Sequence, residues 1–213
     1  MPDRYPGYDV LAKRDTPSWN EPTRRVIAAR LATPNAPRFF NADEWQTLIA
    51  ICDRIMPQPK TRAPVPITAL VDRKMANDEG DGYRQTRMPK MQEAWQRGLA
   101  ALDAAASAKH GKRFHALAAA EQDELLKAMQ AGKLDGSEWG GMPAGTFFSE
   151  RVAHDILAAY YSHPTSWNEI GFGGPASPRG YVRMNFNRRD PWEAVEAKPG
   201  EEAKTREANE RVR

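Results

Sequence analysis

The residues that could act as nucleophiles, bases or metal ligands are few and poorly spaced for such chemistry. The one thiol and the four imidazoles belong to Cys52, His110, His115, His154 and His163. Nucleophilic catalysis needs a base beside an activated hydroxyl or thiol, and no acid–base partner is patterned around His154. Neither His154 with Asp155 nor His110 with His115 has the i,i+4 spacing of two metal ligands on a helix, and a single cysteine makes no thiolate pair. The sequence therefore predicts no catalytic residue and no metal site.

Cofactor-binding loops are not indicated either. The glycines of Gly173-Gly174-Pro175 follow no predicted strand and open no predicted helix, so they do not have the context of a phosphate-binding loop. No dinucleotide fingerprint occurs elsewhere in the chain. Cys52 lies within an apolar helical stripe, where a cysteine behaves as a small buried hydrophobe. We therefore expect no cofactor-binding residues and an inert thiol.

Composition bounds the class of protein. The 213 residues include 31 basic and 28 acidic side chains, and the net charge of +3 does not predict a nucleic-acid-binding protein. The hydrophobic share is 40% and the mean hydropathy is −0.72, which indicates a real core with a large solvated or partner-covered surface. No stretch approaches the roughly 20 apolar residues of a membrane span.

Residues 23–27, Thr-Arg-Arg-Val-Ile, resemble the core of a twin-arginine export motif. The following residues, 28–34, are too few and too charged to form the apolar region of a signal peptide, so a short basic amphipathic turn is predicted instead. The location of the protein stays open. The absence of a signal peptide indicates the cytoplasm, and export with a signal-bearing partner would place the chain in the periplasm.

The hydrophobic spacing predicts an all-α domain of about five helices. The clearest helix begins after Asn41, with Glu44 at the capping-box distance, and ends before Pro57. Further helices are expected near residues 67–76, 89–108, 119–131 and 146–161, and about two turns are expected within 23–31. No segment shows the sustained two-residue alternation of a strand.

Prolines, glycines and charges divide the chain around that domain. Residues 1–38 contain too many prolines for a long helix and are predicted to form an extended arm with aromatic anchors. Residues 39–186 form the helical domain, and its end at 162–186 is an aromatic, glycine-rich loop. Glycines and prolines are expected to prevent regular structure from Trp167 to Met184. Residues 187–213 are predicted to be a charged tail or a solvated final helix near 201–211.

Two groups of residues are candidates for a partner interface. Aromatic and arginine side chains dominate binding hot spots. The glycine-rich loop and the N-terminal arm offer such residues at Trp167, Phe172, Arg179 and Tyr181, and at Tyr5, Tyr8 and Trp19. Aromatics in the loop can equally fold over the chain's own helices, and the sequence alone does not separate the two arrangements.

Three segments carry a resemblance to a known family. They are residues 51–57 (Ile-Cys-Asp-Arg-Ile-Met-Pro), residues 147–151 (Phe-Phe-Ser-Glu-Arg) and, most specifically, the aromatic and glycine-rich residues of 160–181. Over about 39–186 the chain resembles the gluconate 2-dehydrogenase subunit 3 family, the small or gamma subunits of membrane-associated flavin dehydrogenases. Many members begin with a twin-arginine signal, which this sequence does not.

The resemblance implies a role and a partner. Family members accompany a large glucose-methanol-choline-type subunit that holds FAD and oxidises a sugar, sugar acid or alcohol, and a cytochrome c subunit often takes the electrons. The small subunit brings no known catalytic residues and supports stability, maturation and often export of its partner. We therefore expect a non-catalytic accessory subunit with no cofactor of its own.

Two alternatives remain. A free-standing helical chaperone or interaction module would have the same composition but would release its client. An independent enzyme would have to use His154 or His163 as its base. Stable association with a flavoprotein of about twice the mass would favour the accessory subunit.

Overall fold

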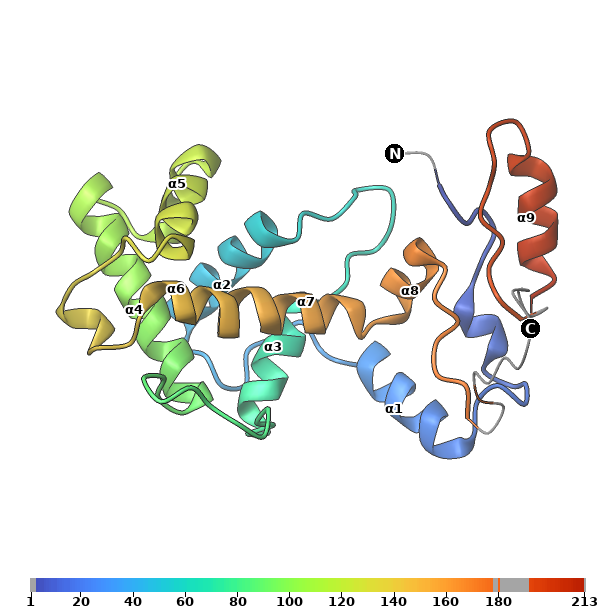
Figure 1. Ribbon diagram of the computed structural model, residues 1–213, viewed down its shortest axis with the longest axis horizontal. Helices are drawn as coiled ribbons and strands as arrows, with labels where there is room; N and C mark the ends of the chain where they lie inside the picture. The colour runs from blue at the N-terminus through green and yellow to red at the C-terminus, as the bar shows by residue number, and fades with distance from the viewer. Residues whose placement is uncertain (1–2, 178–179, 181–191, 213) are drawn as a thin grey trace. The chain divides into compact units, whose positions relative to one another are not determined.

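The protein is built from helices, as the sequence predicts. The computed structural model (Figure 1) describes residues 3–177, 180 and 192–212, and these residues form no strand. Their one β-type contact is an isolated parallel bridge between Trp19 and Ser177. No helix in this part of the chain is long and apolar enough to cross a membrane.

The contacts divide the chain into two compact units. One unit comprises residues 33–160, and the other combines residues 1–32 with residues 161–213. This grouping differs from the arm, domain and tail expected from composition. Prolines limit the length of a helix but do not prevent packing, so the aromatic N-terminal segment joins the C-terminal part of the chain in one unit.

The 33–160 unit contains most of the predicted helices. They are α2(Ala42–Ile55), α3(Ile67–Ala76), α4(Met91–His110), α5(Ala119–Gln130), α6(Ala144–Phe147) and the π-helical η4(Phe148–Ala153), which runs into α7(His154–Tyr161). Short 3₁₀ turns lie at η2(Phe114–Ala116) and η3(Ser137–Trp139). The capping box predicted for α2 is present, because Asn41 accepts from the backbone of Glu44 and Glu44 accepts from the backbone of Asn41.

The helix expected near 146–161 differs from the prediction in its interior. α6, η4 and α7 follow one another without a break and form a single long rod in Figure 1. The middle six residues are π-helical. This conformation is rare in proteins, and where it occurs it is often at a functional site. The spacing of apolar residues does not reveal it, because one wider turn shifts the apolar face only slightly.

A row of aromatic rings lies at the centre of this unit. Phe40, Trp95, Phe147 and Trp139 make successive edge-to-face contacts, with ring centroids 6.2, 5.5 and 6.0 Å apart. Edge-to-face pairs add about 0.5–1.5 kcal/mol each beyond the area that they bury. The row connects the start of α2 with α4, α6 and η3, and therefore fixes how these elements pack.

Asp72 anchors the chain segment that leads into α2. Its buried carboxylate accepts backbone N–H bonds from Arg38 (2.7 Å), Phe39 (3.0 Å) and Phe40 (3.0 Å). A buried charge is stabilised only when such donors replace its water. Asp72 therefore holds residues 38–40 against α3.

The second unit is formed by both ends of the chain. Its helices are η1(Val10–Lys13), α1(Glu21–Leu31), α8(Pro164–Ile170) and α9(Glu202–Glu210). Asn209 is 1% exposed, donates to the carbonyls of Pro6 and Val195, and accepts from the Val195 amide. Val10 donates its amide to Asn168 at 2.8 Å. Both ends therefore depend on each other for their hydrogen bonds.

The prediction that regular structure is absent from Trp167 onward is wrong for residues 167–170. α8 includes Trp167 because Pro164 occupies the first helical turn, where a missing N–H costs nothing, and His163 caps it. Gly171 then ends the helix in the left-handed region, with φ +66°. The prolines and glycines here delimit a short helix instead of preventing one.

The twin-arginine-like residues 23–27 lie within α1. Arg24 donates to the carbonyls of Arg14 (3.1 Å) and Trp19 (2.8 Å), and Ile27 is 1% exposed. The segment therefore has a structural role in the folded unit, in agreement with the amphipathic turn predicted for it. The charged C-terminal residues form α9, the helical alternative of the two considered for them.

Gly98 in α4 tests the packing of the aromatic row. A methyl group at this position would overlap the ring of Phe147, which is fully buried. Alanine favours a helix over glycine by about 1 kcal/mol, but overpacking a core typically costs about 1–3 kcal/mol. We expect Gly98→Ala to lower the free energy of unfolding in urea titrations followed by circular dichroism. Gly80→Ala, with no atom within 4 Å of the added methyl, is the control.

Candidate functional site

Four charged side chains from four segments meet on the 33–160 unit. Lys74 of α3 contacts Asp81 at 2.5 Å and Asp155 of α7 at 2.8 Å. Arg151 of η4 contacts Asp81 at 2.6 Å and Asp155 at 3.5 Å. We call these residues the ion-pair cluster. Each cation faces both carboxylates, so the cluster closes the loop after α3 onto the long rod.

Asp155 is the buried member of the ion-pair cluster. Its side chain is 0% exposed and also accepts a hydrogen bond from the indole N–H of Trp95 at 2.8 Å. Removing one partner from a buried ion pair typically costs about 3–5 kcal/mol, because the remaining charge is left unpaired. Asp155 thus requires Lys74, Arg151 and the central aromatic row in their observed places.

The charges of Lys74 and Asp81 stabilise each other. Burial alone would raise the pKa of Asp81, but hydrogen bonds from Lys74 and Arg151 outweigh it and lower that pKa below its usual 3.8. Burial would likewise lower the pKa of Lys74, and the bonds to Asp155 and Asp81 raise it above 10.5. Both residues are held in their charged forms near neutral pH.

The ion-pair cluster lies beside a group with metal-ligand chemistry. Asp81, His154 and Asp155 each offer a ligand atom, and these atoms lie within 4.8 Å of one another. Lys74 and Arg151, however, already occupy both carboxylates, and a cation placed there would face two like charges. The arrangement is therefore that of a salt-bridge network. Sequence spacing did not indicate it, because Asp81 comes from a different segment.

Two cavities border the loop between α3 and α4. One, of about 390 Å³, is lined by Tyr83, Arg84 and Lys90 together with Glu150 and Arg151 of η4. The other, of about 500 Å³, is lined by Arg87 and by residues of the segment 130–146. The loop residues Tyr83, Arg84, Arg87 and Lys90 were not among the residues predicted from sequence, although the segment 83–90 carries a visible basic signal.

The histidines described here and the cysteine contact neighbouring groups or are buried. His163 is buried and its Nδ1 accepts from the Thr165 amide at 3.3 Å, so the ring caps α8. His110 lies 3.4 Å from Glu121, and His154 is half exposed on the rod, 4.0 Å from Asp81. Burial raises the pKa of the Cys52 thiol to about 12, which keeps it protonated.

The predicted interface residues occupy different surroundings in the second unit. Trp167, Trp19 and Tyr8 are 3%, 1% and 6% exposed and belong to a cluster with Val10 and Ile27. Their aromatic surface is therefore used within the chain. Tyr5 is half-buried against this cluster.

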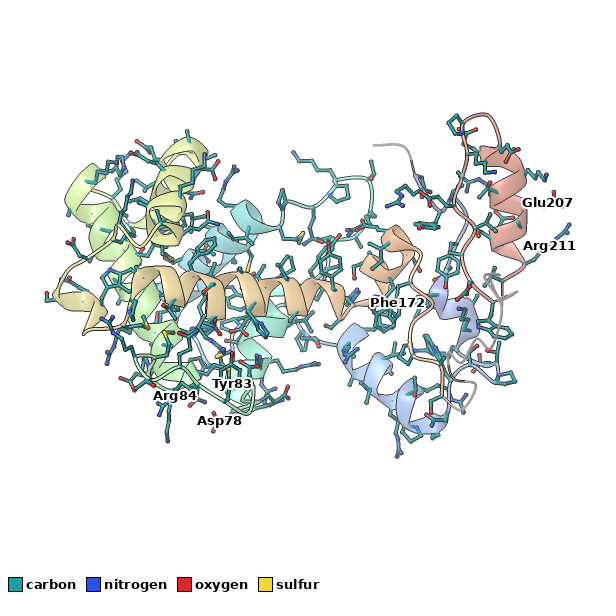
Figure 2. All side chains as sticks on the ribbon, viewed as in Figure 1. Asp78, Tyr83, Arg84, Phe172, Glu207 and Arg211 are labelled. Carbon is teal, nitrogen blue, oxygen red and sulfur yellow. The ribbon has the colours of Figure 1, made fainter. Side chains whose placement is uncertain are left out.

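Among the predicted interface residues that the structure describes, Phe172 is the exposed one. It is 43% exposed and makes an edge-to-face contact with Trp167, with centroids 5.7 Å apart. Figure 2 labels it on the segment that follows α8. Arg179 and Tyr181 lie outside the described residues.

Comparison with known proteins identifies one family. The model of the family described as gluconate 2-dehydrogenase subunit 3 matches residues 42–174. The search of curated proteins gives no match, and neither does the search of solved structures. The matched range contains the ion-pair cluster, the loop after α3 and α8.

Acid should weaken the ion-pair cluster through Asp81. A carboxyl whose pKa is lowered on folding stabilises the protein above its unfolded pKa, and that stabilisation is lost as the pH falls through the folded value. We expect Asp81→Asn to be less stable than wild type near neutral pH and the difference to shrink below about pH 4. Urea unfolding measured across this range tests it. Asp78→Asn, which removes a loop carboxylate but no ion pair, is the control, and an unchanged difference at all pH values would contradict the prediction.

Trp167 and Phe172 should respond differently to truncation. Trp167 is buried and donates its indole N–H to the Tyr161 carbonyl at 2.6 Å, so Trp167→Ala should lower stability by about 3–5 kcal/mol. Phe172→Ala should cost about 1 kcal/mol or less, because much of the ring is already in solvent. Thermal unfolding of both variants checks the order, and equal losses would show that Phe172 belongs to the packed cluster.

Proposed function

Because this chain belongs to the gluconate 2-dehydrogenase subunit 3 family, we propose that it is a non-catalytic subunit that stabilises and supports the maturation of a larger FAD-dependent sugar or alcohol dehydrogenase chain. The observation that carries the proposal is the family match over residues 42–174. This range is more than half of the chain and includes most of the 33–160 unit. Membership of this family supports a place for the chain in a dehydrogenase complex.

The side chains with catalytic potential support an accessory role. His163 has its ring nitrogen engaged as a helix cap, and Cys52 is a buried, protonated thiol. Asp81 and Arg151, two of the charged residues that line a cavity, are already paired with each other. A nucleophile needs an adjacent base that is free to accept its proton, and these engaged groups do not offer one.

The redox cofactor belongs to the partner in this proposal. A dinucleotide-binding βαβ unit needs parallel strands with a glycine-rich turn at a helix N-terminus, whereas the described part of this chain folds into helices alone. FAD would therefore be held by a large glucose-methanol-choline-type subunit, and a cytochrome c subunit would accept the electrons. Substrate contacts would lie in the large subunit.

A subunit that stabilises a partner needs a rigid fold and exposed side chains that can form an interface. The aromatic row and the buried Asp155 give the 33–160 unit its rigidity. Phe172 and Tyr83, 43% and 75% exposed, offer aromatic surface of the kind that is enriched at interfaces. Burying such side chains in a partner would stabilise both chains.

The second candidate function is a helical chaperone that binds a client dehydrogenase and then releases it. The same exposed aromatic side chains would serve either role. The lifetime of the complex separates the two: a subunit stays bound through purification with a fixed stoichiometry, whereas a chaperone dissociates from its mature client.

Co-purification of the chain with its partner tests the proposal directly. The tagged full chain, produced in its native host, should retain a flavin-containing polypeptide in a fixed molar ratio through size exclusion. The same chain produced alone should show no flavin or haem absorption after dialysis, and should aggregate more readily because its interface is uncovered. A lone chain that retains flavin, or that melts identically with and without the flavoprotein, would count against the proposal.

A further inference from the structure

Basic residues gather in the second half of the loop between α3 and α4, whereas its acidic residues lie in the first half. Residues 83–90, here called the basic loop, contain Arg84, Arg87 and Lys90 and no acidic residue. All three side chains are exposed, and none makes an ion pair or a hydrogen bond with the described part of the chain. Arginines elsewhere on the same unit, such as Arg54 and Arg113, are paired with carboxylates.

An aromatic side chain opens the basic loop. Tyr83 is 75% exposed, the highest value among the large hydrophobic residues that the structure describes as exposed. Figure 2 shows Tyr83 and Arg84 on this loop, with Arg84 projecting away from the helices. Tyrosine and arginine are enriched at binding hot spots, and exposed side chains of these types in adjacent positions indicate an interface.

The basic loop is held in place just before its start and within it. Before it, Asp81 is fixed by Lys74 and Arg151. Within it, Gln85 donates to Glu150 at 3.0 Å and its carbonyl accepts from the amide of the buried Met88 at 2.9 Å. A segment that is already ordered loses little conformational entropy on binding. The exposed side chains of the basic loop are therefore positioned before a partner binds.

The surface around the basic loop is hollowed on two sides. Tyr83, Arg84 and Lys90 line the cavity of about 390 Å³, and Arg87 lines that of about 500 Å³. Glu150 and Asp78 also line the first cavity, and Glu150 is already bonded to Gln85. Cavities beside exposed aromatic and basic side chains suit a partner that inserts side chains and brings carboxylates.

We propose that the basic loop docks on an acidic surface of the flavin-bearing dehydrogenase subunit, whose carboxylates pair with Arg84, Arg87 and Lys90 around the Tyr83 ring. Charge complementarity selects this occupant. A basic surface would repel the three unpaired cations, and an apolar surface would leave their charge unpaired. The inference rests on the proposed function and adds the face of the chain and the chemistry of the partner.

Charge reversal tests the docking surface in the full chain. The tagged double variant Arg84→Glu/Arg87→Glu, produced in the native host, should retain at least tenfold less flavin per mole of tagged chain than wild type. Tyr83→Ala should also lower retention, and Arg84→Lys/Arg87→Lys should preserve most of it, because the charge stays. Raising the salt concentration should release the flavoprotein from wild type, since exposed ion pairs are screened.

A matched variant controls for net charge. Lys60→Glu/Lys133→Glu makes the same change in charge at exposed positions in other loops of the 33–160 unit, and should leave flavin retention within twofold of wild type. Circular dichroism should be the same for all variants, because none of these side chains is buried. Equal retention by the basic-loop reversal and wild type would overturn this inference alone. A wild-type chain that retains no flavoprotein would overturn the proposed function, and this inference with it.

Discussion

The buried charge of Asp155 is the constraint on which the 33–160 unit depends. Its carboxylate is fully buried, so Lys74 and Arg151 must neutralise its charge, and the Trp95 indole donates a hydrogen bond to it. An unpaired buried carboxylate would cost several kcal/mol, a large part of the stability of a typical domain. The requirement brings α3, α4, η4 and α7 to one point, and it links a surface loop to the hydrophobic core.

The π-helical turn lies next to the residues that neutralise Asp155. Phe147 directly precedes the π turn, Arg151 lies within it, and Asp155 lies in the first turn of α7 that follows. Phe147 fills the space left open by Gly98, while Arg151 reaches Asp81. The conformation thus lets one rod supply an apolar face to the core and a charged face to the loop after α3.

Local signals explain which parts of the fold could be predicted. Apolar spacing located the helices because each helix buries one face, and the Asn41 and Glu44 pair marked a helix start because it satisfies free backbone donors. The ion-pair cluster could not be predicted, since Lys74, Asp81, Arg151 and Asp155 come from separate segments and each alone resembles a solvated surface charge. Only tertiary packing shows that Asp155 is buried.

The predicted interface shows a different limit of sequence reasoning. Aromatic residues near glycines and prolines indicate either internal packing or a partner surface, and composition does not distinguish the two. The structure uses Trp19 and Trp167 inside the unit formed by the two ends of the chain, and leaves Phe172 partly exposed beside Trp167.

The two units of the chain are stabilised in different ways. The 33–160 unit is stabilised by a continuous hydrophobic core and by buried charge, so its surface features are held rigidly. The other unit depends on residues from opposite ends of the chain, with Asn209 bonded to Pro6 and Val195. This unit therefore forms only when residues 1–32 and 161–213, which are distant in the sequence, pack together.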